Sequence, residues 1–152
     1  MKKFRNALLL AAALALGLSF ALRAADPVPD GAVKKSYPTG ELMSEYSYLY
    51  GKLDGLSLDY YKNGQVMYEW NYRRGKLHGV SRAYSMKGKL MASWSYKNGV
   101  LHGKSVEYHD NGKKKSYVVY RQGQKVFIKT FNEKGKLLQK EDRRKLPAPT
   151  AG

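Results

Sequence analysis

The chain has 152 residues, with 28 Lys plus Arg against 12 Asp plus Glu, and it contains no cysteine. A chain of this length forms one modest domain, and the absence of cysteine excludes disulfides, thiolate nucleophiles and cysteine-ligated zinc. Thirteen tyrosines and fifteen glycines exclude a disordered chain, because disordered sequences are poor in aromatic residues.

The first 25 residues are organised like a secretory signal peptide. Met1 to Arg5 form a basic segment, and residues 7–18 form an apolar run followed by small residues. This run is shorter than the roughly 20 residues that cross a bilayer, so a retained anchor is the less favoured alternative. We expect residues 1–25 to be a signal peptide cleaved within 21–25, residues 26–30 to be a linker, and the mature protein to be periplasmic or secreted.

Glycines and tyrosines recur with a period of 24 residues from residue 31 onward, and such a fixed period predicts a repeat architecture. Tyr48, Tyr72, Tyr96 and Tyr120 form one series. The glycines of the lattice predict turns, because glycine adopts positive φ without strain. The predicted turn glycines are Gly40, Gly51, Gly55, Gly64, Gly75, Gly79, Gly88, Gly99, Gly103, Gly112, Gly123 and Gly135.

Each period contains two turn signals. Asn63-Gly64 predicts a two-residue hairpin turn, because both residues tolerate positive φ, and Asn111-Gly112 repeats it. The second turn, from Gly51 to Gly55, has two glycines four residues apart and predicts a wider loop.

The segments between the turns alternate like half-buried strands. Val66, Tyr68, Trp70 and Tyr72 are predicted to share one face of a sheet. Each 24-residue unit is therefore expected to be a β-hairpin, and residues 31–136 an all-β, elongated antiparallel meander in a single layer, with about nine or ten strands. Residues 137–152 are expected to form a basic C-terminal cap and tail, whose first part is either a strand or a short helix.

The repeat has a recognisable motif: Tyr60-Tyr61-Lys62-Asn63-Gly64, then Tyr72, then glycines at 75 and 79. It resembles the MORN-variant repeat of the bacterial YwqK-type antitoxin family, and the resemblance covers residues 31–135. It implies a non-enzymatic protein that binds and neutralises a toxin. In the fourth unit Phe127 replaces the second loop glycine, so the last hairpin is expected to be a cap.

The histidines do not form a convincing chemical site. His78 and His102 occupy the same loop position in neighbouring units, about 10 Å apart, and Asp54 takes that position one unit earlier. A shared metal ion needs nitrogen ligands about 2 Å away, so a polar role in the turn is favoured. No nucleophile recurs in register with a base. We therefore expect no catalytic residue, no metal, no cofactor and no enzymatic activity.

Two groups of residues are candidates for partner binding. The aromatic residues either pack across strands to hold the sheet or remain accessible as a binding surface, because a single layer leaves both faces exposed. Residues 103–146 carry a net charge of +8, which either protects the sheet edge from aggregation or attracts an acidic partner. The candidates are Trp70, Tyr72, Trp94, Tyr96, Tyr120, Lys113, Lys114 and Lys115.

Three functions fit these patterns. The first is an exported binder of one toxin-like protein, and the second is a peripheral envelope module that binds anionic lipid or cell-wall polymer through the basic end. The third is a structural spacer without a dedicated ligand. Nucleic acid is the less favoured partner, because export separates the protein from its usual supply.

Overall fold

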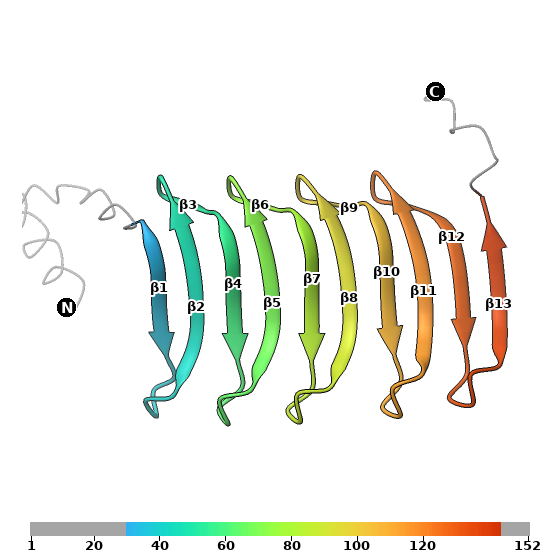
Figure 1. Cartoon of the computed structure of the whole chain (residues 1–152), viewed down its shortest axis with the longest axis horizontal. Coiled ribbons are helices and arrows are strands. Elements are labelled where there is room, and N and C mark those ends of the chain that lie inside the picture. Colours follow the sequence, from blue (N-terminus) through green and yellow to red (C-terminus); the bar gives the residue numbers. More distant parts are fainter. Residues whose placement is uncertain (1–29, 144–152) are drawn as a thin grey trace, which may run out of the picture.

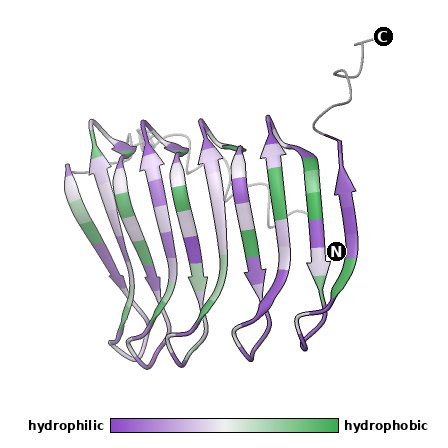
Figure 2. Cartoon of the chain, turned by 45° about the vertical axis from the view of Figure 1, so that its right-hand side comes forward, coloured by the Kyte–Doolittle hydropathy of each residue, from purple (hydrophilic) through white to green (hydrophobic). Residues whose placement is uncertain are grey.

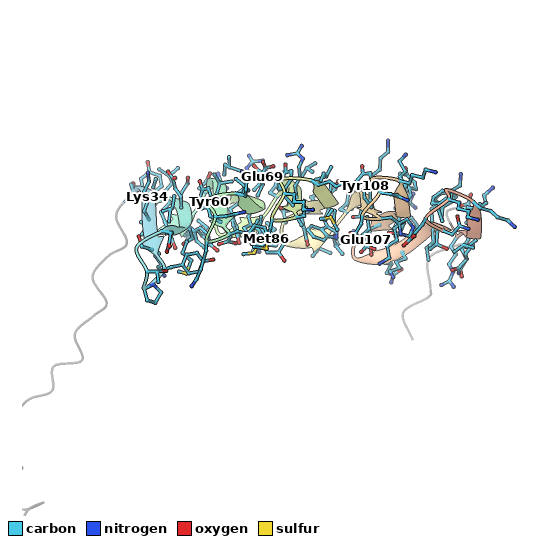
Figure 3. The ribbon with its side chains drawn as sticks, turned by 90° about the horizontal axis from the view of Figure 1, so that it is seen from below. Lys34, Tyr60, Glu69, Met86, Glu107 and Tyr108 are labelled. Carbon is cyan, nitrogen blue, oxygen red and sulfur yellow. The ribbon has the colours of Figure 1, made fainter. Side chains whose placement is uncertain are left out.

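The computed structural model describes residues 30–143, which form one open antiparallel sheet of 13 strands (Figure 1). The sheet is a single layer, with side chains projecting from both sides (Figure 3). None of the described residues forms a helix, and so none of them forms one that could cross a membrane. The predicted all-β meander of hairpins is confirmed. The predicted signal peptide lies outside the described residues.

Ten long strands follow one another across the sheet in chain order. They are β1 (Gly31–Ser36), β2 (Leu42–Leu49), β4 (Gly55–Tyr60), β5 (Val66–Arg73), β7 (Gly79–Tyr84), β8 (Leu90–Lys97), β10 (Gly103–Tyr108), β11 (Lys114–Arg121), β12 (Gln124–Phe131) and β13 (Leu137–Asp142). Three two-residue strands, β3 (Lys52–Leu53), β6 (Lys76–Leu77) and β9 (Val100–Leu101), pair with the ends of β2, β5 and β8. The segment that begins at residue 137 is thus a strand rather than a helix.

The Asn-Gly turns at the lower edge in Figure 1 differ from the prediction. Gly64 has a φ of 80°, whereas Asn63 does not have a positive φ. The Gly64 N–H donates to the Tyr61 carbonyl at 2.9 Å, and the Tyr61 N–H donates to the Gln65 carbonyl at 2.8 Å. These bonds define a three-residue loop that ends in a left-handed glycine. The prediction of a two-residue turn there was wrong.

Two-residue turns with two positive φ angles lie instead at the upper edge. Tyr50 and Gly51 have φ angles of 51° and 67°, and the pairs at 74–75, 98–99 and 122–123 repeat this geometry. The wide loop predicted for residues 51–55 is therefore a tight turn followed by a bulge. In that bulge residues 54–57 lie opposite residues 46 and 47.

Successive hairpins are joined at both edges by hydrogen bonds between units. At the upper edge the Gly75 N–H donates to the Leu53 carbonyl at 2.7 Å, and Gly99 and Gly123 repeat this contact one and two units later. At the lower edge the Tyr61 hydroxyl donates to the Tyr84 carbonyl at 2.9 Å. Neighbouring units therefore dock in one fixed register.

Apolar burial comes from rings that lie beside small residues on the facing strand. Tyr72 lies opposite Gly55, and Trp70 lies opposite Ser57, whose exposure is 0%. A ring beside a glycine covers backbone that would otherwise remain bare. Figure 2 shows hydrophobic residues spread over the strands rather than gathered into a layer. The buried residues are Ser44, Ser57, Ser81, Ala92, Ser105, Val118 and Phe127.

Replacing Gly103 by valine should destabilise the sheet. Gly103 has a φ of 96°, and an added Cβ would lie 3.3 Å from the Ser95 Cβ. The left-handed conformation and this close contact together should lower the free energy of unfolding by about 2–4 kcal/mol. Urea denaturation followed by circular dichroism measures the loss. Lys104→Val, at the next and exposed position, is the matched control; equal effects of the two variants would contradict the argument.

Deleting one complete unit should be tolerated better than deleting half of one. Removal of residues 80–103 joins strands that run in compatible directions, because the unit length is 24 residues. Removal of residues 80–91 reverses the direction of every later strand. Thermal denaturation should therefore show a cooperative transition for the complete deletion only. A folded half-unit deletion with the same midpoint would refute the register.

Candidate binding surfaces

Register places both tryptophans and a row of tyrosines on one side of the sheet, because directly opposite residues point the same way. We call this side the aromatic face; the other is the opposite face. Figure 3 shows Lys34, Glu69 and Tyr108 on the opposite face and Glu107 on the aromatic face. The half-buried rings of the aromatic face are Tyr46, Tyr48, Tyr68, Trp70, Tyr72, Trp94, Tyr96 and Tyr120.

The predicted alternation holds from Tyr68 to Tyr72 but not at Val66. A bulge between Asp59 and Tyr60 pairs Val66 with Tyr60. Asp59 lies on the aromatic face, so the next residue, Tyr60, points to the opposite face. Val66 therefore leaves the row of rings to which the sequence assigned it.

Asp59 fixes the N-terminal part of the aromatic face. The Tyr46 hydroxyl donates to Asp59 Oδ1 at 2.8 Å, and Trp70 Nε1 donates to Asp59 Oδ2 at 2.7 Å. Tyr68 stacks on Trp70 with ring centroids 5.0 Å apart. Side chains from three strands, β2, β4 and β5, are thereby held in one arrangement. The role of Asp59 is not visible in the sequence because its position does not recur: residues 83 and 107 are Ala and Glu.

Trp94 has the same place in the next unit but a different environment. It lies opposite the fully buried Ser81, as Trp70 lies opposite Ser57. Ala83 replaces the carboxylate that holds Trp70, and within residues 30–143 the Trp94 indole N–H has no hydrogen-bond partner. That N–H is also not among the buried unpaired atoms, so solvent or a partner can reach it.

The tyrosine row crosses four units along the aromatic face. Burial is the largest cause that raises the pKa of Tyr72, Tyr96 and Tyr120 above 10.0. Nearby negative charge adds to the effect, from Asp59 at Tyr72 and from Glu107 at Tyr120. The row therefore offers neutral hydroxyl groups to a partner at physiological pH.

The three lysines predicted as a cluster, Lys113 to Lys115, have different positions in the structure. The Lys113 ammonium donates to the Lys134 carbonyl at 3.1 Å, which ties two lower loops together. Lys114 pairs with Tyr108, and a register shift leaves Lys115 as the extra residue of a bulge. All three side chains are exposed, yet they do not join the row of rings.

Asp54 and His102 serve the turns, as the sequence predicted. The Arg74 N–H donates to Asp54 Oδ2 at 2.9 Å, and the Gln122 N–H lies 3.4 Å from His102 Nδ1. The equivalent nitrogen of His78 is buried without a hydrogen-bond partner. Among residues 30–143 no group of three His, Asp or Glu side chains is close enough to hold a metal ion.

Comparison with protein families identifies the repeat. The family described as MORN repeat variant matches residues 29–50, 53–74 and 101–122. The chain therefore carries three MORN repeats of the variant type. The intervening segment, residues 77–98, has the same strand pairing as its matched neighbours. No curated protein matches the chain.

Several solved structures match the chain at low overall similarity. The Gap123 glycosylation-associated protein complex from Streptococcus agalactiae has a TM-score of 0.41 at 15% identity, covering 70% of this chain and 20% of that one. TarM has a TM-score of 0.40 at 12% identity, and the match covers 93% of this chain and 23% of TarM. A GtfA/B complex bound to UDP and GlcNAc has a TM-score of 0.31 at 15% identity, and the match covers 77% of this chain and 25% of the matched chain. This chain thus matches a quarter or less of each, and at these scores the likeness carries no functional argument.

Alkaline pH should weaken the fold through the half-buried tyrosines Tyr72, Tyr96 and Tyr120. Their pKa lies at 10.0 in the unfolded chain and higher in the folded one, so the folded state retains protons that the unfolded state releases. The contribution is complete below pH 10 and is lost as the pH rises towards the folded pKa. Urea midpoints measured from about pH 8 to pH 11 should therefore fall at the upper end of the range.

A substitution separates this effect from general alkaline damage. Tyr72→Phe removes one ionisable ring from the row and should reduce the decrease of the urea midpoint at high pH. Tyr50→Phe changes a turn ring that is 85% exposed and should leave the fall unchanged. Midpoints that stay level across the range would show that burial does not hold the tyrosines neutral.

Proposed function

We propose that this chain is an exported, non-enzymatic binding protein that holds one partner protein against its aromatic face, as an antitoxin or immunity protein does. The observation that carries the proposal is a row of half-buried rings on a single-layer sheet that no other described element covers. Buried rings in a globular domain would be enclosed by a second layer. Here every ring of the row keeps part of its surface exposed.

The dimensions and chemistry of this face suit a protein partner. Ten long strands at about 4.8 Å spacing extend about 43 Å, and an eight-residue strand about 27 Å, so the face measures roughly 1,150 Å² and exceeds the roughly 800 Å² that one partner buries in a standard interface. Trp and Tyr are enriched among interface residues that dominate affinity, because they bury a large area with few rotatable bonds. Trp94 adds, near the middle of the sheet, an indole N–H that no other described residue accepts.

Crosslinking in the cell envelope followed by mass spectrometry identifies the partner. We expect one protein to co-purify in a fixed stoichiometry and to remain partly bound at high salt, because buried aromatic contacts are insensitive to ionic screening. Intact mass of the envelope protein tests export in the same sample. Retention of Met1 would contradict cleavage of the signal peptide.

Replacing Trp94 by alanine should accelerate dissociation from that partner. Loss of a central aromatic anchor typically costs about 2 kcal/mol or more, which corresponds to an off-rate raised about 30-fold or more. Surface plasmon resonance measures the rate, and circular dichroism establishes that the sheet is intact. Trp70 is a poorer probe, since its loss also removes the hydrogen bond to Asp59.

The matched control is Leu56→Ala, which removes an exposed apolar side chain from the opposite face. Its off-rate should equal that of the unmodified chain. If Trp94→Ala and Trp94→Phe both remain folded and bind with unchanged kinetics, the aromatic face serves the fold alone.

The exposed basic end favours a second candidate, a peripheral envelope module that binds anionic lipid or cell-wall polymer. Residues 103–146 have a net charge of +8, and Lys113 to Lys115 are exposed. Changing these three lysines to glutamine should slow association with a protein partner and flatten its salt dependence, while the off-rate changes little. Complete loss of binding, with no salt-resistant component left, would favour the electrostatic module.

A further inference from the structure

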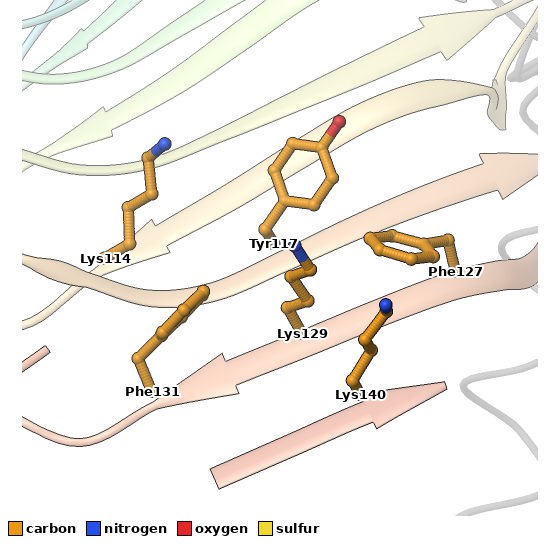
Figure 4. A pocket seen from close by; sticks show the side chains of 6 residues that line it. All are labelled: Lys114, Tyr117, Phe127, Lys129, Phe131 and Lys140. Carbon is orange, nitrogen blue, oxygen red and sulfur yellow. The ribbon is translucent and has the colours of Figure 1, made fainter. Parts of the chain in front are cut away.

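The opposite face has a hollow near its C-terminal end, formed by β11, β12 and β13 (Figure 4). Its volume is about 480 Å³, which lies within the range of small-molecule sites. Three ammonium groups and three aromatic rings line it: Lys114, Tyr117, Phe127, Lys129, Phe131 and Lys140.

The rings provide a fixed apolar floor. Phe127 is only 6% exposed, and the Tyr117 ring meets it edge to face with centroids 6.0 Å apart. The Lys129 ammonium lies 5.6 Å from the centre of the Phe127 ring. The last loop is one residue shorter than the loops before it, so Phe127 lies beside Val119 on the opposite face and not in the position of Gly103, which lies beside Tyr120 on the aromatic face.

Charges on the opposite face are balanced near the N-terminus. Lys34 lies 3.6 Å from Glu45, and Arg82 lies 3.0 Å from Glu69, each across neighbouring strands. Each of these residues lies beside its partner on the next strand, and together they form a row across the sheet. After Arg82 the row continues with Ser93 and Val106 and then reaches the hollow. Ser93 and Tyr117 occupy the positions that carry Glu45 and Glu69 in earlier units.

The balance is lost at the hollow. Lys129 lies directly opposite Lys140 on the next strand, with Tyr117 on its other side. Like charges directly opposite one another destabilise a sheet. Asp142 shares this face, but neither lysine, nor Lys114, forms an ion pair with another of the described residues. Within residues 30–143 no ion pair therefore compensates the positive charge of these three lysines.

We propose that this hollow binds a small organic anion, with a phosphate group between the lysine ammonium groups and a ring-shaped body against the aromatic floor. Lysine is a common phosphate ligand, acting as a point charge, and aromatic side chains bury flat apolar surfaces. The bound phosphate relieves the repulsion between Lys129 and Lys140. This site is on the other side of the sheet from the aromatic face and does not depend on the proposed partner protein.

Titration of the full chain with phenyl phosphate, followed by NMR, tests the site. We expect shifts confined to β11, β12 and β13, with phenyl phosphate binding about tenfold more tightly than inorganic phosphate because the ring adds apolar burial. Phenol, which has the ring but no phosphate, should not bind measurably. Glucose 1-phosphate run in parallel distinguishes a sugar from an aryl body. Shifts on the aromatic face, or equal affinity for inorganic and phenyl phosphate, would overturn the proposal.

Lys140→Gln gives a signature that a purely structural lysine would not produce. Binding of phenyl phosphate should weaken about five- to tenfold, while the thermal midpoint of the free protein rises by roughly 1–3 °C as the repulsion is removed. Lys104→Gln removes an exposed lysine of the same face outside the hollow and should change neither the affinity nor the midpoint. Unchanged binding in Lys140→Gln, or a lowered midpoint, would contradict the assignment.

Discussion

A tyrosine ring beside a glycine of the facing strand is the contact on which the first four hairpins of this sheet depend. A sheet of one layer has no second layer to enclose its apolar groups, so burial must be found within one face. Glycine provides the left-handed backbone that the bulge needs and the space that the ring fills. The fully buried serines beneath the tryptophans repeat the same solution one pair further along the strands. This mutual requirement explains why glycines and tyrosines share one period.

The 24-residue period made the architecture predictable from the sequence, but it did not predict the geometry of the turns. An Asn-Gly pair fits both a two-residue turn and the end of a three-residue loop, and local sequence does not distinguish them. The true two-residue turns begin with Tyr50, Arg74, Asn98 and Gln122, side chains with no common chemistry. Their positive φ angles are imposed by the pairing of the flanking strands. Tertiary context, rather than propensity, decided these positions.

The candidate sites divide in the same way. The rings of the aromatic face were found because their spacing is regular, but their fixation by Asp59 depends on one residue in one unit. The hollow was missed because Lys129, Lys140 and Phe127 become neighbours only through the register of the irregular last hairpins. The bulges set that register, and sequence periodicity does not reveal them. Because the sheet is one layer thick, a ligand in the hollow leaves the aromatic face unobstructed.

The open order of the strands has a mechanical consequence. β1 and β13 are the two outer strands, at opposite ends of the long axis, and the strands run across that axis (Figure 1). A force pulling these ends apart acts along the inter-strand hydrogen bonds and loads them one row after another, as in opening a zipper. Such a sheet yields at low force, one hairpin at a time. Each 24-residue unit then releases about 80 Å of extended chain, so a sheet loaded in this way lengthens in steps of about that size.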